Sequence, residues 1–129
     1  MSDAPADRRA TLVDASEIDL KNLQALDLWR KALLDSLHHE GPDLSARQMA
    51  VMLTVYLTPA PHTVRGLAST LNASKPAIVR ALDTLGRLGF LRRRRDEADR
   101  RNVLVQRTVK GAVFLSEFAD AVVRAGRPG

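Results

Sequence analysis

Basic side chains are concentrated in one segment of the chain, between Ala73 and Gly111. Residues 1–72 hold seven Lys and Arg against nine Asp and Glu, a net charge of −2, whereas residues 73–129 hold thirteen against six, a net charge of +7. Guanidinium and ammonium groups at this density can neutralise closely spaced phosphates, which supplies much of the affinity of proteins for duplex DNA. The charge distribution therefore predicts a polyanion-binding surface in the C-terminal part of the chain.

The segment after Ser74 has the pattern of an amphipathic helix with a basic outer face. Ile78, Leu82 and Leu85 recur at steps of four and three and predict its buried side. Ser74 is a suitable N-cap, and Gly89 can take the left-handed conformation that ends a helix. The residues expected to lie in the major groove are Ser74, Lys75, Pro76, Ala77, Val79, Arg80 and Thr84. Taken alone, these side chains could equally be the solvated face of a surface helix.

Two strand-like segments, residues 90–95 and 102–107, flank a charged turn at residues 96–101. Consecutive arginines alternate sides in a strand and do not fit an apolar core, so we expect this run to hold phosphates. Asp99 stands two residues before Arg101 and can orient its guanidinium toward a minor groove. The residues expected to contact DNA from this hairpin are Arg92, Arg93, Arg94, Arg95, Asp99, Arg100 and Arg101. The alternative is an ordinary charged hairpin.

The elements before this hairpin predict a winged helix-turn-helix over residues 63–107. Thr63 can cap a short helix that ends at Leu71, and Asn72-Ala73 forms a tight turn before the basic helix. Ser45 can cap a preceding helix that is apolar nearly all round, which places it in the middle of the domain. The predicted fold is mainly α with a small β-hairpin wing.

Two flanking helices, residues 17–40 and 108–125, carry more apolar side chains than one small core requires. Ser16 is the candidate cap of the first. The surplus suggests a partner helix from a second copy of the chain, so both helices are expected to dimerise. Residues 1–15 show no apolar period and are expected to be a disordered tail ahead of a single domain over residues 16–125.

Several classes of function are not expected. The chain has no cysteine, which removes disulfides, thiolate chemistry and zinc-finger ligation. Its apolar runs are shorter than the ~20 residues of a membrane span, and a cytoplasmic protein is expected. The sequence shows no nucleophile beside a base, no phosphate-binding loop and no paired carboxylates, so an enzyme is not expected. The adjacent His38 and His39 point about 100° apart on a helix, and neither metal nor cofactor is expected.

A small group of larger side chains could line a pocket for an effector, although core packing is the preferred interpretation. These residues are Trp29, Met49, Met52 and Tyr56.

Residues 63–111 resemble the MarR family of multiple-antibiotic-resistance-type regulators. The resemblance rests on the helix-turn-helix, the Gly89-Phe90 entry to the wing, the Asp99-x-Arg101 motif and Thr108-x-x-Gly111. It implies a homodimeric transcription regulator, a repressor, with two recognition helices in successive major grooves of a pseudo-palindromic operator. It also implies that a small aromatic effector can release the DNA. About eighteen residues follow Gly111, fewer than is usual in the family.

A different class of function is compatible with the same fold. A winged helix can also dock on a protein or an RNA element and bind DNA only non-specifically. Competition by random duplex DNA would distinguish the two, because an operator complex survives an excess that a non-specific complex does not.

Overall fold

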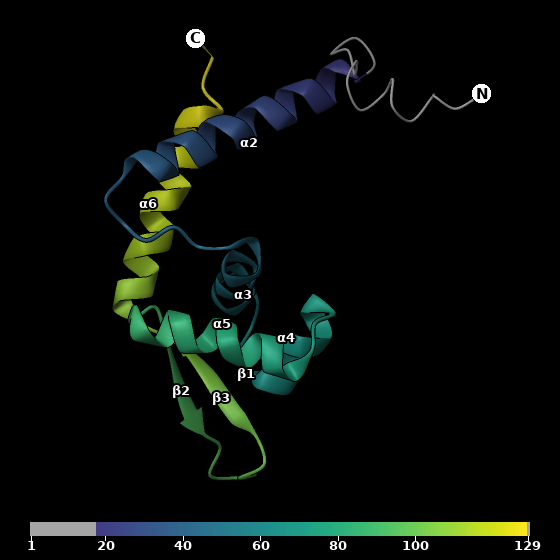
Figure 1. Ribbon diagram of the computed structural model, residues 1–129, viewed down its shortest axis with the longest axis vertical. Helices are drawn as coiled ribbons and strands as arrows, with labels where there is room; N and C mark the ends of the chain where they lie inside the picture. Colours follow the sequence, from purple (N-terminus) through teal and green to yellow (C-terminus); the bar gives the residue numbers. More distant parts are fainter. Residues whose placement is uncertain (1–17, 129) are drawn as a thin grey trace, which may run out of the picture. The chain divides into compact units, whose positions relative to one another are not determined.

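The structure is a computed structural model that describes residues 18–128 and divides the chain into two compact units (Figure 1). One unit consists of Met1–His39 and Ala121–Gly129, and the other consists of Glu40–Asp120. The predicted tail at residues 1–15 and the predicted cap Ser16 lie outside the described residues. No helix in the described part of the chain is long and apolar enough to cross a membrane.

The Glu40–Asp120 unit contains a helix-turn-helix and a three-stranded antiparallel sheet. Its elements are α3 (Ala46–Leu57), β1 (His62–Thr63), α4 (Val64–Leu71), α5 (Lys75–Arg87), β2 (Leu91–Arg95), β3 (Val103–Arg107) and the first part of α6 (Val109–Ala125). The strand order is β1-β3-β2, and Val105 pairs with both His62 and Arg93. The mainly α fold with a wing is thus confirmed. Strand β1 was not predicted, because two residues are too short to show alternation.

The three predicted N-caps of this unit are confirmed. The hydroxyls of Ser45, Thr63 and Ser74 each accept the backbone N–H three residues on, at 3.1, 2.9 and 3.2 Å. Asn72 ends α4 with φ 50° and Gly89 follows α5 with φ 78°, so both take the left-handed conformation that ends a helix. Asn72 and the Ser74 cap together define the turn between α4 and α5.

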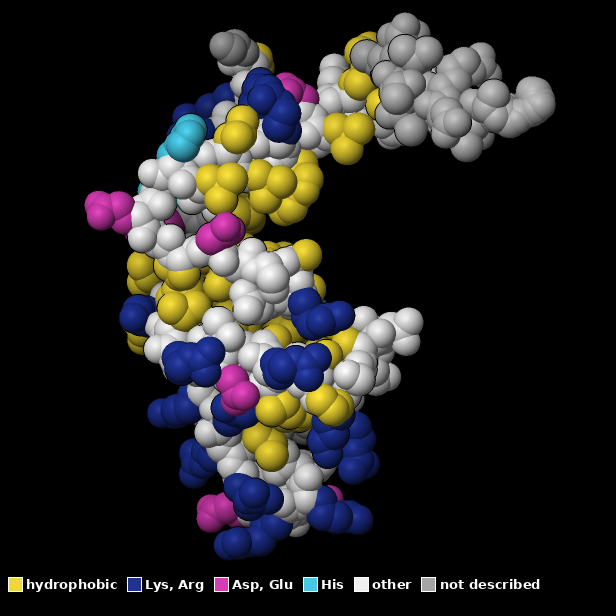
Figure 2. Space-filling model, viewed as in Figure 1, with side chains coloured by type: hydrophobic (Ala, Val, Ile, Leu, Met, Phe, Trp, Pro, Cys, Tyr) yellow, Lys and Arg dark blue, Asp and Glu magenta, His cyan; other side chains and the backbone are white. Residues whose placement is uncertain are grey.

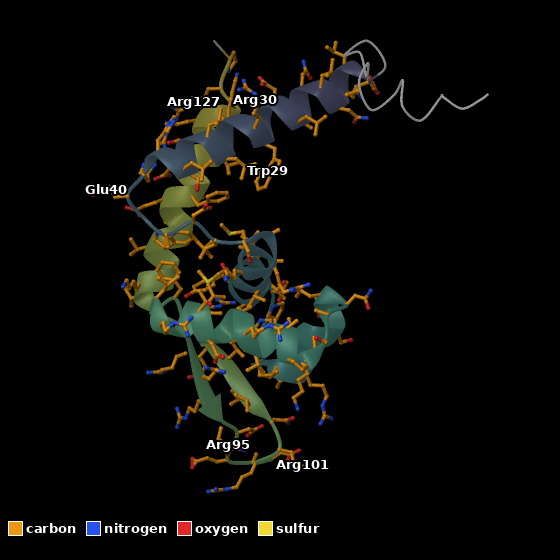
Figure 3. The ribbon with its side chains drawn as sticks, in the orientation of Figure 1. Trp29, Arg30, Glu40, Arg95, Arg101 and Arg127 are labelled. Carbon is orange, nitrogen blue, oxygen red and sulfur yellow. The ribbon has the colours of Figure 1, made fainter. Side chains whose placement is uncertain are left out.

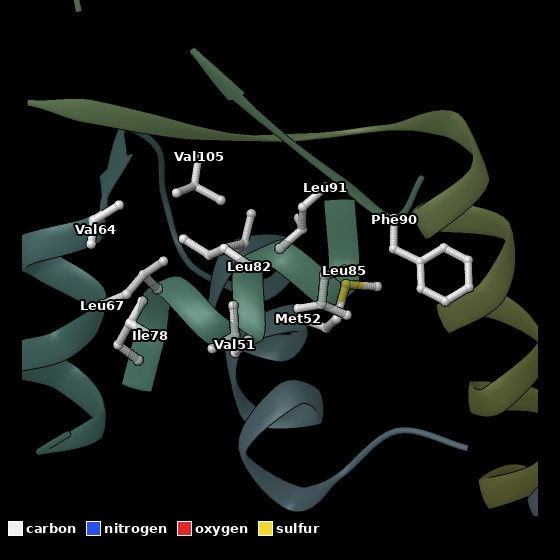
Figure 4. Close-up of a cluster of buried hydrophobic side chains, with 12 residues drawn as sticks. Val51, Met52, Val64, Leu67, Ile78, Leu82, Leu85, Phe90, Leu91 and Val105 are labelled. Atoms are coloured by element: carbon white, nitrogen blue, oxygen red, sulfur yellow. The ribbon is translucent and has the colours of Figure 1, made fainter. Parts of the chain in front are cut away.

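A single apolar cluster holds α3, α4, α5 and the sheet together (Figure 4). The predicted buried side of α5 is confirmed for Ile78, Leu82 and Leu85, while Leu88 is only half-buried. Phe90, expected to begin the first strand, instead precedes it and stacks on Phe114 with ring centroids 4.5 Å apart. The cluster comprises Val51, Met52, Val55, Val64, Leu67, Ile78, Ala81, Leu82, Leu85, Phe90, Leu91 and Val105.

Tyr56 ties the entry and exit of the hairpin to α3. Its hydroxyl donates to the Phe90 carbonyl at 2.7 Å and accepts the Thr108 backbone N–H at 2.9 Å. The Thr108 hydroxyl accepts the Gly111 N–H at 3.0 Å and so caps α6, and it donates to the Gly89 carbonyl at 2.7 Å. A Cβ at Gly111 would overlap the Tyr56 hydroxyl and the Phe90 carbonyl. This close approach gives a physical reason for the Thr108-x-x-Gly111 motif.

The other unit consists, in its described part, of α2 (Leu20–His38) and the end of α6. The predicted helix at 17–40 is too long, because Asp19 caps its start and His39 takes an extended conformation after its end. Arg124 donates to Asp35 at 2.7 Å.

No group of three or more potential ligands for a metal ion occurs within residues 18–128.

Only two hydrophobic side chains of this unit's described residues, Ala32 and Ala121, are buried. Large apolar side chains remain exposed along it and are visible beside α2 in Figure 2. They are Leu20, Leu26, Trp29, Leu33, Leu34, Leu37 and Val123.

Candidate nucleic-acid interface

The outer face of α5 presents the basic residues that the sequence analysis placed there. Lys75, Pro76 and Arg80 are exposed, and Val79 and Thr84 are half-buried. The Ser74 hydroxyl already accepts a backbone N–H as the N-cap, so a DNA contact from Ser74 would use its remaining hydrogen-bonding capacity. Lys and Arg side chains crowd over α5 and the hairpin in Figure 2, with few acidic ones between them.

Ala77 does not belong to this exposed face. It is 6% exposed and lies on the buried side of α5, next to Ile78. Ala77 was expected to lie in the major groove, but a methyl group buried inside the protein cannot reach a base edge. The prediction for Ala77 is therefore wrong, and Val79 is left as the apolar side chain on this face.

The arginine run forms β2, and all four side chains are exposed as predicted. Three of them have partners inside the protein. Arg92 donates to the Gln106 side chain at 3.4 Å, Arg93 to Asp83 at 2.6 Å, and Arg95 to the Arg100 carbonyl at 2.6 Å. These contacts within the protein offset part of the mutual repulsion of the four arginines.

The wing tip holds Arg101 in a two-pronged contact with Asp99. Arg101 Nε and Nη2 lie 3.0 Å from Oδ1 and Oδ2 of Asp99, and the Arg101 backbone N–H donates to Oδ1 at 3.2 Å. These hydrogen bonds from Arg101 lower the pKa of Asp99 and raise that of Arg101. Arg95 and Arg101 both lie at the end of the hairpin (Figure 3). The predicted pairing of Asp99 with Arg101 is confirmed.

Arg65, on α4, was missed by the sequence analysis. Its side chain is exposed and lines a hollow of about 100 Å³ that α4, α5 and the hairpin enclose. The positive charge of Arg65 also contributes to the lowered pKa of Asp99, after the hydrogen bonds from Arg101. In the sequence Arg65 is a lone cation between Val64 and Gly66, and only the fold brings it to the wing.

Two residues of the suggested effector pocket serve the core instead. Met52 is 0% exposed and Tyr56 anchors the hairpin. Met49 is half-buried, and Trp29 belongs to the other compact unit. For Met52 and Tyr56 the structure agrees with the preferred interpretation, core packing.

Comparisons with known proteins relate this winged helix-turn-helix to a family of regulators. Residues 44–103 match the sequence model of the MarR family. A search of curated proteins gave no match. Among solved structures, a mutant of MarR from E. coli is 28% identical with a TM-score of 0.62, over 83% of this chain and 78% of that chain.

Two further structures extend the likeness over nearly the whole chain. The transcriptional regulator BldR from Sulfolobus solfataricus is 25% identical with a TM-score of 0.59, over 96% of this chain and 81% of that one. A MarR-family regulator from Rhodococcus sp. RHA1 is 25% identical with a TM-score of 0.60, over 96% and 79%. The fold is that of DNA-binding transcription regulators and not of an enzyme family.

Proposed function

We propose that this chain, whose residues 44–103 match the model of the MarR family, is a repressor that binds a pseudo-palindromic operator in duplex DNA as a homodimer. One observation carries the proposal. The exposed basic face of α5 and the Asp99–Arg101 fork at the wing tip belong to the same compact unit. One compact unit can thus present a helix to the major groove and an arginine to the adjacent minor groove.

Base recognition is assigned to the first turns of α5. The N-terminal part of the second helix of a helix-turn-helix lies deepest in the major groove. Arg80 can donate two hydrogen bonds to a guanine, and Val79 can contact a thymine methyl group. Lys75 stands at the start of the helix, where free backbone N–H groups also favour a phosphate. Arg80 and Val79 therefore determine which sequence is bound.

The wing supplies contacts that do not depend on sequence. Arg94 and Arg100 are exposed and have no acidic partner among residues 18–128, so they are available to phosphates. Arg101 is held by Asp99, which lowers the conformational entropy lost when it enters a minor groove. Loss of any one of these cations should weaken binding to all sequences alike.

Homodimerisation is supported by the apolar surface of the unit that contains α2. Leu26, Leu33 and Leu37 are at least 40% exposed and recur at spacings of seven and four, which places them on one side of the helix. Burial of a leucine side chain contributes roughly 1.5–3 kcal/mol. A second copy can cover this surface through a two-fold interface, and that symmetry matches a pseudo-palindromic operator.

The test is footprinting of the purified protein on the DNA upstream of its own gene, with an excess of random duplex as competitor. A protected site with two half-sites about 34–36 Å apart supports the proposal. Arg80→Ala should lose about 1–3 kcal/mol of discrimination at one base pair of each half-site. Arg101→Ala should weaken binding to operator and random DNA alike. Arg47, exposed on α3, is the control, and Arg47→Ala should bind as the wild type does.

Equal competition by operator and random DNA would contradict the proposal. It would favour a winged-helix module for protein or RNA with only non-specific DNA affinity.

A further inference from the structure

Four cationic side chains surround the small hollow between α4, the start of α5 and the hairpin. They are Arg65, Lys75, Arg93 and Arg101. The hollow measures about 100 Å³, whereas sites for drug-sized ligands measure roughly 300–1,000 Å³. Its size and its charge suit a small anionic group such as a single phosphate.

Two of these four cations already have acidic partners. Arg93 is paired with Asp83 at 2.6 Å, and Arg101 is paired with Asp99 at 3.0 Å. The side chains of Arg65 and Lys75 form no ion pair or hydrogen bond within the described part of the chain. The hollow therefore keeps two positive charges that an incoming anion can neutralise.

The fold fixes where Arg65 stands. It is the second residue of α4, directly after Val64, which is buried in the core, and Thr63 caps the helix. Arg65 lies close enough to the wing tip for its charge to act on the Asp99 carboxylate. A cation on the first helix of the helix-turn-helix thus faces the same space as the wing.

We propose that Arg65 contacts the DNA backbone and that Arg65 and Lys75 hold one phosphate in this hollow, beside the minor groove that Arg101 enters. The inference rests on the proposed function and adds a contact to it. A phosphate bound here touches α4, α5 and the hairpin at one point. This contact fixes the positions of α5 and the wing on one strand of the DNA duplex, because phosphate contacts set the position of a protein on DNA.

Ethylation interference on the footprinted operator tests the contact directly, with Arg65→Ala compared with Arg47→Ala. In the wild type, ethylation of one phosphate beside the wing should block binding. That interference should vanish in Arg65→Ala and persist in Arg47→Ala. Affinity of Arg65→Ala should fall about tenfold for each protomer, the loss expected for one hydrogen bond to a charged group. The slope of log K against log salt should decrease by about 0.9 for each protomer.

Two results would overturn the inference while leaving the proposed function intact. One is an Arg65→Ala variant that binds the operator with the interference pattern and salt slope of the wild type. The other is that the hollow binds free phosphate and not the DNA backbone. In that case inorganic phosphate displaces DNA more strongly than chloride does at equal ionic strength, and Arg65→Ala abolishes this displacement without changing the affinity for the operator. Absence of operator preference in the wild type would instead contradict the proposed function. Thermal unfolding of each variant controls for folding. Because Arg65 is exposed, Arg65→Ala should leave the melting temperature unchanged.

Discussion

The two compact units differ in how far their own residues cover their apolar surface. In the Glu40–Asp120 unit, side chains from three helices and the sheet bury one another in a continuous cluster. In the unit that contains α2, the only buried hydrophobic side chains of the described residues are two alanines, while Trp29 and several leucines stay exposed. The first unit has a core of its own, whereas the second has an apolar surface that stays exposed among residues 18–128.

This difference matches the two tasks of the proposed dimeric regulator. A surface that must meet DNA at fixed positions needs a rigid support, which a closed core provides. A surface that must meet a second copy needs exposed apolar area, which destabilises an isolated chain in water. We infer that the winged unit is stable through its own contacts and that α2 gains its stability by association.

The largest effect is expected in the core of the winged unit. Leu82→Ala removes a side chain that is 1% exposed, and it should lower the free energy of unfolding by about 2–5 kcal/mol. Urea denaturation measures the change. Leu53→Ala is the control on the same unit, because Leu53 is already 37% exposed, and its cost should be well below that of Leu82→Ala. Equal costs would mean that this unit has no closed core.

The next effect concerns the exposed face of α2. Leu33→Asp places a charge where a partner helix should pack, and dimerisation should weaken by on the order of 2–4 kcal/mol. Sedimentation equilibrium gives the dissociation constant. Asn22→Asp, also exposed on α2, makes the same change in charge at a polar position and should leave the dimer intact. A Leu33→Asp protein that dimerises like the wild type would show that this face does not meet a second copy.

A smaller effect is expected where the hairpin joins α3. Tyr56→Phe removes the hydroxyl that donates to the Phe90 carbonyl and accepts the Thr108 N–H. Leaving these groups unsatisfied should cost about 1–3 kcal/mol in the free energy of unfolding, while the dimerisation constant stays unchanged. Chemical denaturation and sedimentation together separate the two quantities. A change in dimerisation without a change in stability would contradict the division between the units.

The smallest effect concerns one Asp–Arg pair from each unit, Asp99–Arg101 and Asp35–Arg124. Hydrogen bonds from Arg101 hold the pKa of Asp99 below the ordinary 3.8, and hydrogen bonds from Arg124 do the same for Asp35. A lowered folded-state pKa means that each pair contributes stability above the ordinary pKa and loses it as pH falls through the lowered one. Carboxyl chemical shifts followed by NMR as a function of pH give the two pKa values. The pKa of Asp99 should rise in Arg101→Ala, and the pKa of Asp35 should rise in Arg124→Ala. A carboxyl that titrates unchanged would mean that its pair does not form in solution.

The sequence by itself determined the local elements of the winged unit and the Asp99–Arg101 pair. Caps at Ser45, Thr63 and Ser74 and the helical period of α5 act over a few residues, so their outcome is visible in the order of residues. Asp99 and Arg101 are two positions apart, and their contact also needs no tertiary structure.

Only the tertiary structure decided which exposed cations share a site. Arg65 and Arg101 are separated by α4, α5 and β2 along the chain, and the packing of the core brings them to one hollow. Packing also buried Ala77, which follows the exposed Lys75 and Pro76, and it added β1 to the hairpin. These contacts join residues that are distant in sequence, and local periodicity carries no information about which distant surfaces will meet.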